Sequence, residues 1–229
     1  MIFGTRKFDV NNLCLYYKDK TINHVSSTTF LGVILDDKLS WNNHISQLCS
    51  TISRNIGILR KLYFLPQNIL KLLYHSLISS HLSYCSMTWG FSSKCNLKRI
   101  HLLQKRAIRI ITHSHYLLPT AALFSRMKIL PIQNIVSLQT GIFMHDCYND
   151  LLPSSLQDYF NLNCNIHSYN TRNTYSFHPP LLRTEISKSS IFYQGPILWN
   201  NLPTILKEYK SPNQFNQFKN NYKRLLLNQ

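Results

Sequence analysis

Apolar residues that recur at steps of three and four positions restrict the fold of this chain more than any other feature. After Ser40, a suitable N-cap residue, these positions are Ile45, Leu48, Cys49, Ile52, Ile56 and Leu59. That spacing places them on one face of a helix. Three prolines, Pro66, Pro119 and Pro131, each suit the first turn of a further helix.

These helices are expected to be joined by short connections. The helix that begins at Pro66 should run to about Met87 and end near Gly90, another should cover about 95–112, and the helix from Pro131 should extend through the 140s. Because short connections bring successive helices back on themselves, we expect neighbours in sequence to pack antiparallel.

The two ends of the chain show other patterns. Residues 1–36 are expected to be β-structure, since the runs 13–17 and 28–35 are rich in β-branched and aromatic residues. Two or three strands that start at residue 1 are too few for a stable sheet, so they look like the edge of a larger one. After Pro153 the periodicity is lost, and residues 160–200 are expected to form an extended loop or short strands. A last helix is expected from the capping sequence 211–214, with the apolar stripe Phe215, Phe218, Tyr222, Leu225 and Leu226.

These patterns predict a mainly α fold. A short N-terminal β element should be followed by an antiparallel helical bundle and by a C-terminal tail that is partly extended and partly helical. The expected divisions are residues 1–38, 39–150 and 151–229.

Charge is the second strong feature. The formal net charge is +16, and no Asp or Glu occurs between Lys38 and His145, where 13 Lys and Arg lie. About a dozen carboxylates would be expected in a stretch of that length. A surface of one sign favours a polyanionic partner. The alternative is a bias toward A/T-rich codons, although the codons for Asp and Glu are themselves partly A/T-rich.

The helix around 98–111 gives this charge a location. At 100° per residue, Lys98, Lys105 and Arg109 lie close together, with Arg99 and Arg106 next to them. Ile100, Leu103, Ala107, Ile110 and Ile111 occupy the opposite arc. A solvated charged face is the simpler interpretation, but no acid within the helix compensates the repulsion. We therefore interpret the five cations as a nucleic-acid contact, with Arg54, Arg60 and Lys61 as weaker members.

Patterns for catalysis are missing from the sequence. Asp36 and Asp37 are the one acidic pair, but neighbouring strand residues point to opposite faces, so we expect them to cap the following turn. His113 and His115 lack the spacing of zinc ligands on a helix. No Gly-x-Ser-x-Gly turn or phosphate-binding glycine loop is present. No catalytic residue, metal or cofactor is therefore expected.

Aromatic and cysteine residues have simple interpretations. Trp41, Tyr63, Trp89 and Trp199 could stack on bases, although core positions are expected for Trp41 and Trp89. The cysteines, which lie at positions 14, 49, 85, 95, 147 and 164, have irregular spacing that argues against a disulfide framework or a zinc ribbon. No secretory signal or membrane-spanning stretch is recognised. We expect an intracellular protein of the nucleus or cytoplasm without a membrane partner.

Several segments resemble the C-terminal part of the reverse transcriptase of non-LTR retrotransposons (LINEs) of the jockey and RTE kind. They are FLGVILD at 30–36 with LSW at 39–41 and HI at 44–45, GILRKL at 57–62, LYHSLI at 73–78, LSYC at 82–85, WG at 89–90, LQKRAIR at 103–109, HSYNTR at 167–172 and GPILWNNLP at 195–203. They cover nearly the whole chain in order. The resemblance implies a palm edge over 1–38, a thumb-like helical domain over 39–150 and a C-terminal extension.

The resemblance also implies a function. In such RNA-directed DNA polymerases the thumb grips the template–primer duplex, so the partner expected here is the backbone of an RNA–DNA duplex, together with the palm and fingers of a full-length relative. The family's polymerase carboxylates would precede Met1, and the expectation is a transposable-element fragment without polymerase activity. The alternatives are a protein-interaction or structural module that uses residues 160–229, a retroelement-derived protein adopted by its host, and an enzyme completed by another chain.

Overall fold

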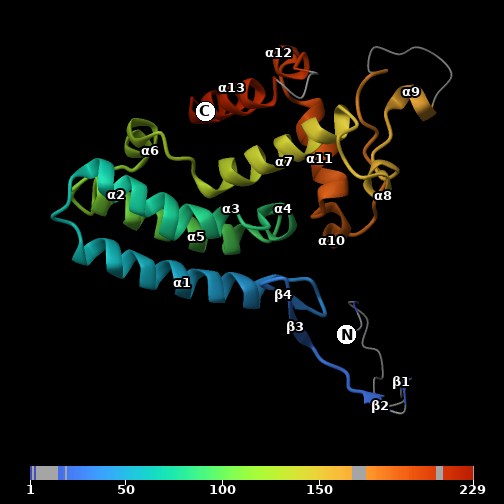
Figure 1. Ribbon diagram of the computed structural model, residues 1–229, viewed down its shortest axis with the longest axis horizontal. Helices are drawn as coiled ribbons and strands as arrows, with labels where there is room; N and C mark the ends of the chain where they lie inside the picture. The colour runs from blue at the N-terminus through green and yellow to red at the C-terminus, as the bar shows by residue number, and fades with distance from the viewer. Residues whose placement is uncertain (2, 4–14, 19, 167–173, 210–213, 229) are drawn as a thin grey trace.

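The computed structural model describes residues 1, 3, 15–18, 20–166, 174–209 and 214–228. It is mainly helical, which confirms the expected fold class (Figure 1). Residue 2 of the expected start, residues 13–14 of the run 13–17, residues 211–213 of the capping sequence and the motif at 167–172 lie outside the described residues.

Two β-hairpins form the N-terminal element. One pairs β1 (Leu15–Tyr17) with β2 (Lys20–Ile22), and the other pairs β3 (Ser27–Phe30) with β4 (Val33–Asp36), both antiparallel. The run 28–35, which was expected to be β-structure, lies within this second hairpin. Leu31 and Gly32 have φ of 47° and 77°, which are the positive values of a tight hairpin turn.

Three helical segments form the first part of the bundle. They are α1 (Asn42–Lys61), the continuous helix made of α2 (Gln67–Tyr74), the π-helical turn η2 (His75–Ser79) and α3 (Ser80–Ser83), and α5 (Lys94–Ile111). Asn55 Nδ2 donates to the Leu77 carbonyl at 2.5 Å, and Gln67 Nε2 donates to the Ile111 carbonyl at 3.3 Å. Each successive helix therefore reverses direction, as expected, and α1 and α5 run parallel to each other.

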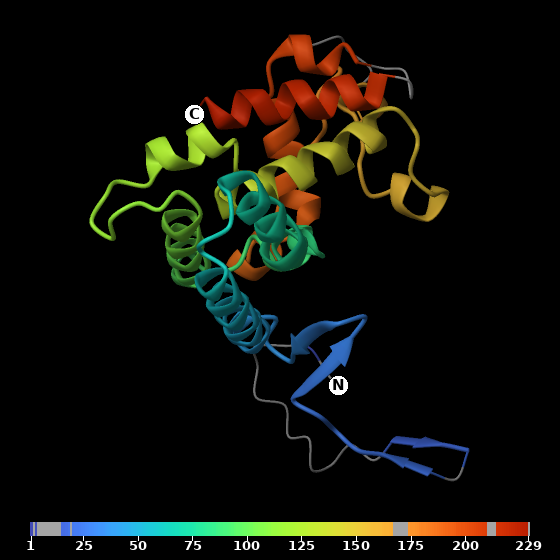
Figure 2. The ribbon, with the colours of Figure 1, turned by 60° about the vertical axis from the view of Figure 1, so that its left-hand side comes forward.

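The remaining helices pack on this first part. They are α4 (Ser86–Trp89), α6 (Ala121–Met127), α7 (Ile132–Tyr148), α8 (Ser154–Gln157), α9 (Asn163–Ile166), α10 (Glu185–Lys188), α11 (Ile191–Asn200), α12 (Thr204–Lys207) and α13 (Phe215–Leu227). Helix α7 lies between the first helices and the C-terminal ones (Figures 1 and 2). One hydrophobic cluster extends from Ile45 in α1 to Leu226 in α13. Among the described helices, none is both long and apolar enough to cross a membrane.

Two helical predictions need correction. The helix from Pro66 ends at Ser83 rather than near Met87, because Tyr84 is extended and Cys85 has a φ of 48°. The Trp89 indole nitrogen donates to the Tyr84 carbonyl at 3.0 Å, which stabilises this break.

Residues 160–200 contain helix α11, although a loop or strands were expected. Proline inside a helix removes a hydrogen bond and normally disfavours it. In α11, Gly195, Pro196 and Trp199 are buried, and Gly195 lies against Met144 of α7. Packing on α7 therefore outweighs the local cost of Pro196.

Asp36 shapes the entry to α1. Its carboxylate accepts hydrogen bonds from the backbone amides of Lys38, Ser40 and Trp41 at 3.1, 2.9 and 2.9 Å. The expected capping role of the acidic pair is confirmed for Asp36. The helix itself begins at Asn42 with Trp41 at the N-cap position, so the expected N-cap at Ser40 was wrong.

A buried amide joins three helices at the centre of the bundle. Gln104 has no exposed surface, and its Nε2 donates to the Tyr74 hydroxyl at 3.0 Å and to the Leu130 carbonyl at 3.2 Å. Its Oε1 accepts from the Ile132 amide at 2.7 Å. These bonds connect α5 with α2 and with the start of α7.

Replacing this amide should destabilise the fold. Gln104→Leu keeps a side chain of similar size but leaves the buried Ile132 amide and Leu130 carbonyl unpaired. We expect a loss of about 3 kcal/mol in the free energy of unfolding, measured by urea titration. Gln217→Leu, at an exposed position of α13, is the control and should change it by less than about 0.5 kcal/mol. Equal urea midpoints for the two variants would contradict this role of Gln104.

Candidate nucleic-acid interface

Helix α5 turns one face to the core and its cations to solvent. The buried residues are Asn96, Ile100, Gln104, Ala107, Ile108 and Ile111. Lys98, Arg99 and Arg106 are exposed, and Lys105 and Arg109 are half-buried. Leu103 and Ile110, expected on the core side, are only half-buried at its margin.

Helices α1 and α5 pack parallel to each other, and this brings cations of the two helices close together. Near their N-terminal ends, Asn96 Nδ2 donates to Asn42 Oδ1 at 2.9 Å, and Arg99 Nη2 donates to Ser46 Oγ at 3.2 Å. Near their C-terminal ends, the two helices and the following loop line a groove of about 620 Å³. Its lining residues are Arg60, Tyr63, Leu102, Arg106, Arg109, Ile110, His113, Ser114 and Tyr116.

The groove combines three guanidinium groups with exposed aromatic rings. Tyr63 is 60% exposed and Tyr116 is 71% exposed. Arg109 donates from Nε and Nη2 to the Leu118 carbonyl at 3.4 and 3.2 Å, which holds the loop after α5 against the helix. Guanidinium forks match phosphate oxygens, and exposed rings can stack on bases. The arrangement suits a nucleic-acid backbone with adjacent bases or sugars.

The cations predicted from the sequence fall into three groups. Arg60, Arg106 and Arg109 line the groove. Lys105 belongs to the same face of α5, whereas Lys98 and Arg99 lie toward the other end of that face. Arg54 and Lys61 are exposed on α1 but do not line the groove. At 100° per residue they lie about 120° and 100° around the helix from Arg60.

Tyr116 and Leu102 are among the groove residues that were not predicted as site residues. Tyr116 lies in the loop after α5, which Arg109 binds at the Leu118 carbonyl. Leu102 is 54% exposed, and the sequence could have identified it. It lies four residues after Lys98 and four residues before Arg106, and therefore on the same face of the helix. An apolar residue on a charged helical face suggests a surface that contacts something other than water.

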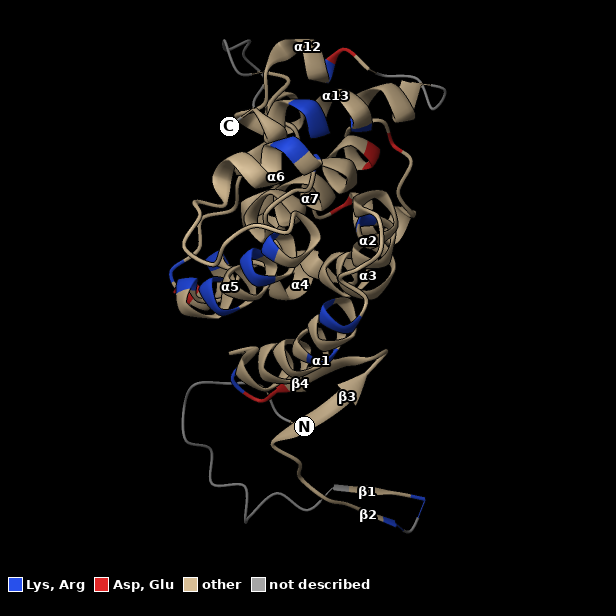
Figure 3. Ribbon diagram, turned by 90° about the vertical axis from the view of Figure 1, so that its left-hand side faces the viewer, with Lys and Arg blue, Asp and Glu red and all other residues tan. Residues whose placement is uncertain are grey.

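The candidate cations lack acidic partners in the described part of the chain. There the ion pair of a Lys or Arg is Lys188–Glu185, and Asp146 lies 3.2 Å from His145. Figure 3 views the molecule from the side where α6 lies, and it shows Lys and Arg on α1, α2, α5, α6 and α13. Arg60 and Arg109 also complement the negative ends of their helix dipoles, but Lys94 and Lys98 lie near the positive end of α5 and gain no such benefit. An external anion would stabilise these two lysines.

Three histidines in this acid-free region resist protonation. Burial lowers the pKa of His44, whose Nδ1 accepts from the Ile34 amide at 3.4 Å. Burial and then the charge of Lys105 lower the pKa of His101, with a smaller opposing effect of the bond to Gln104. Burial, Lys223 and Lys71 lower the pKa of His75. The neutral forms are therefore favoured in the folded protein.

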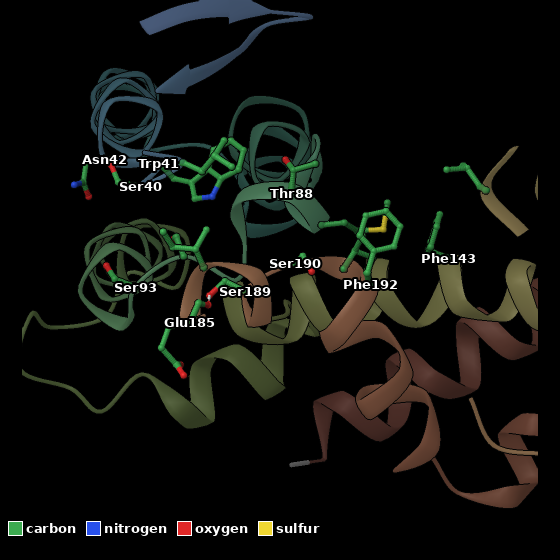
Figure 4. A pocket seen from close by; sticks show the side chains of 16 residues that line it. Ser40, Trp41, Asn42, Thr88, Ser93, Phe143, Glu185, Ser189, Ser190 and Phe192 are labelled. Carbon is green, nitrogen blue, oxygen red and sulfur yellow. Dashed lines mark hydrogen bonds between the residues drawn. The ribbon is translucent and has the colours of Figure 1, made fainter. Parts of the chain in front are cut away.

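A second hollow is apolar and offers no such chemistry. It has a volume of about 730 Å³ and lies between the start of α1, α4, α7 and α10–α11, with Trp41, Phe143 and Phe192 among its lining residues (Figure 4). Glu185 is the acid at its edge, but its carboxylate is 87% exposed and binds Lys188 at 2.7 Å. Trp89 is fully buried, as expected, whereas Trp41 is only half-buried at this hollow.

The chain resembles known proteins in sequence. The chain is similar to the probable RNA-directed DNA polymerase from transposon X-element of Drosophila melanogaster, with 22% identity over 62% of this chain and 17% of that protein. It is also similar to the RNA-directed DNA polymerase from mobile element jockey of the same organism, with 25% identity over 48% of this chain and 12% of that protein. The expected resemblance to non-LTR retrotransposon reverse transcriptases is confirmed.

The comparisons leave much of these relatives outside the match. The chain spans less than a fifth of the length of either polymerase. No protein-family model matches the chain, and no solved structure does.

Acid should destabilise this protein at a higher pH than usual. The pKa of His44 is lowered from 6.5 in the folded state, so the unfolded chain binds a proton at this residue more readily than the folded protein does. The stability that neutral His44 allows is therefore complete above pH 6.5 and decreases as the pH falls below that value. Since His75 and His101 shift in the same direction, the melting temperature should begin to fall below about pH 6.5 rather than in the range where carboxylates titrate.

A substitution tests this origin. His44→Asn keeps an acceptor for the Ile34 amide but does not titrate, so it should reduce the fall in melting temperature between about pH 7.5 and 5.5. His115→Asn, at an exposed position, should leave that fall unchanged. A melting temperature that is constant down to about pH 5 would refute the prediction.

Proposed function

We propose that this chain is the nucleic-acid-gripping part of a retroelement RNA-directed DNA polymerase, and that it holds the backbone of an RNA–DNA template–primer duplex. The groove between α1 and α5 is the main support for this proposal. It gathers Arg60, Arg106 and Arg109 with two exposed tyrosines in a region without acidic residues. The similarity to two retrotransposon polymerases supports the same function.

Contact with phosphates explains the residue types in the groove. Two or three guanidinium groups on neighbouring helices can contact successive phosphates of one strand, and each neutralised phosphate releases a counterion. The binding should depend on salt and little on sequence. Leu102 and the tyrosines would then contact sugars or bases beside the backbone.

We propose further that the chain does not itself extend a primer. Two-metal phosphoryl transfer needs carboxylates that converge on the ions. Asp36, the buried acid beside the helical bundle, has both carboxylate oxygens engaged with the amides and the hydroxyl of residues 38–41. This structural role supports a polymerase site located in other parts of the relatives.

Removing groove cations should weaken duplex binding. For Arg60→Gln/Arg106→Gln, we expect the affinity for an RNA–DNA duplex at low salt to fall about tenfold or more, and the slope of log affinity against log salt to decrease by about 1.8. Fluorescence anisotropy with a labelled duplex between about 50 and 200 mM salt measures both. Arg109 is left intact because it holds the Leu118 carbonyl.

Matched variants locate the interface. Lys18→Gln/Lys20→Gln removes the same charge from the β1–β2 hairpin, which lies away from the helices (Figure 1), and should keep the slope of the original chain. Arg54→Gln/Lys61→Gln tests whether the outer face of α1 also takes part. If the groove variant and the hairpin variant bind equally well, the groove is not the duplex site.

Catalysis is tested separately. The purified chain, incubated with a primed RNA template, deoxynucleotides and Mg²⁺, should give no extended primer, because we propose that its polymerase carboxylates lie elsewhere. Denaturing gel electrophoresis resolves single-nucleotide additions. Extension that is lost in Asp36→Asn but retained in Asp158→Asn would place catalysis in this chain and overturn the proposal.

A further inference from the structure

A second basic groove lies at the C-terminal end of the molecule. It has a volume of about 970 Å³ and is lined by Ser125, Lys128, Asn220, Lys223, Arg224, Leu227 and Asn228. Ser125 and Lys128 come from α6 and the residue that follows it, and the others come from α13 and its C-cap. None of the lining residues is acidic.

Packing fixes this groove relative to the first one. His101 of α5 stacks on Phe124 of α6 with ring centroids 5.6 Å apart. Ser125 Oγ donates to the Leu227 carbonyl at 3.5 Å, and Asn134 Nδ2 donates to the Leu226 carbonyl at 2.6 Å. His113, Ser114 and Tyr116 line the first groove and Lys128 lines the second, so the segment 113–128 connects the two grooves along the chain.

The charges of the second groove extend onto α2. Lys223 and Lys71 both contribute to the lowered pKa of His75, after the effect of burial. Lys223 of α13 and Lys71 of α2 therefore both act on His75. Figure 3 shows cations of α6 and α13 on the same side of the molecule as those of α5.

We propose that the groove between α6 and α13 binds a single strand of nucleic acid that continues from a duplex held at the α1–α5 groove. This inference rests on the proposed function. It assigns a nucleic-acid contact to α13, which belongs to the segment 160–229 for which the sequence suggested protein interaction as an alternative.

The composition of the groove favours a strand over a duplex. Lys128, Lys223 and Arg224 supply phosphate contacts. Asn220 and Asn228 supply amides, which can bond to base edges that are accessible in unpaired strands. The volume of about 970 Å³ is close to that of a small-ligand pocket, which suits a few nucleotides of one strand. No aromatic side chain lines it, so stacking should contribute little.

The test compares two probes on the full chain. One is a blunt RNA–DNA duplex, and the other is the same duplex with an unpaired RNA extension. The unmodified chain should bind the extended probe more tightly, by about tenfold at low salt. The variant Lys128→Asn/Arg224→Gln should lose this gain and keep its affinity for the blunt duplex. Asn suits position 128 because its φ is 54°.

A matched control keeps the same helices and the same loss of charge. Arg126→Gln/Lys219→Gln changes exposed residues of α6 and α13 that do not line the groove, so it should keep the gain from the extension. Circular dichroism melts of all variants verify that each is folded.

The outcomes separate the two proposals. If Lys128→Asn/Arg224→Gln retains the full gain, the second groove is not a strand site, while the duplex proposal stands. If the control variant loses the gain equally, general surface charge explains it and the groove assignment is wrong. If the unmodified chain binds the extended probe but not the blunt duplex, the duplex grip fails and the strand site is retained.

Discussion

The buried amide of Gln104 is the constraint on which the rest of this structure depends. A fully buried amide must satisfy its hydrogen-bonding groups, and Gln104 does so with partners on α2 and at the entry to α7. These bonds fix the rotation of α5 about its own axis. Once that rotation is set, Lys98, Arg99 and Arg106 can only face solvent. A core polar group thus determines the direction of the charged surface, although it never contacts a ligand.

Local pattern predicted the helices well and their interruptions poorly. The apolar face of α1 and the charged face of α5 follow from periodicity, which is visible in a short stretch of sequence. The helix through Pro196 depends on packing of Gly195 against Met144, and the break at Tyr84 is joined to the hairpin turn at Leu31 by a contact between distant residues. Tyr84 offers an example, since its hydroxyl donates to the Leu31 carbonyl at 2.6 Å, fifty-three positions away in sequence. Such pairs leave no mark in a short window of sequence.

The candidate site shows the same division. Arg106 and Arg109 could be placed on one face from spacing alone, and Arg60 could be identified as a basic residue near a helix end. Their convergence could not be predicted, because antiparallel neighbours make α1 and α5 parallel but do not by themselves bring these two helices into contact. Tyr116 lies in a loop that Arg109 binds at the Leu118 carbonyl, and this contact is not visible in the sequence. The separation of Arg60 from Arg54 and Lys61 likewise becomes clear only when the side of α1 that meets α5 is known.

Residues 38–145 contain no acidic side chains that could neutralise the cations of this surface. Repulsion among unpaired cations is weakest when they are spread apart and solvated, yet this fold brings three arginines into one groove and places Lys128, Lys223 and Arg224 in another. The contacts that bring them together are uncharged: the stacking of His101 on Phe124, the Asn134 bond to α13 and the Gln104 amide. Neutral packing therefore holds the charges in place before any anion arrives. A polyanion that binds one groove lowers the repulsion felt along α6, so occupation of the first groove should favour a strand in the second.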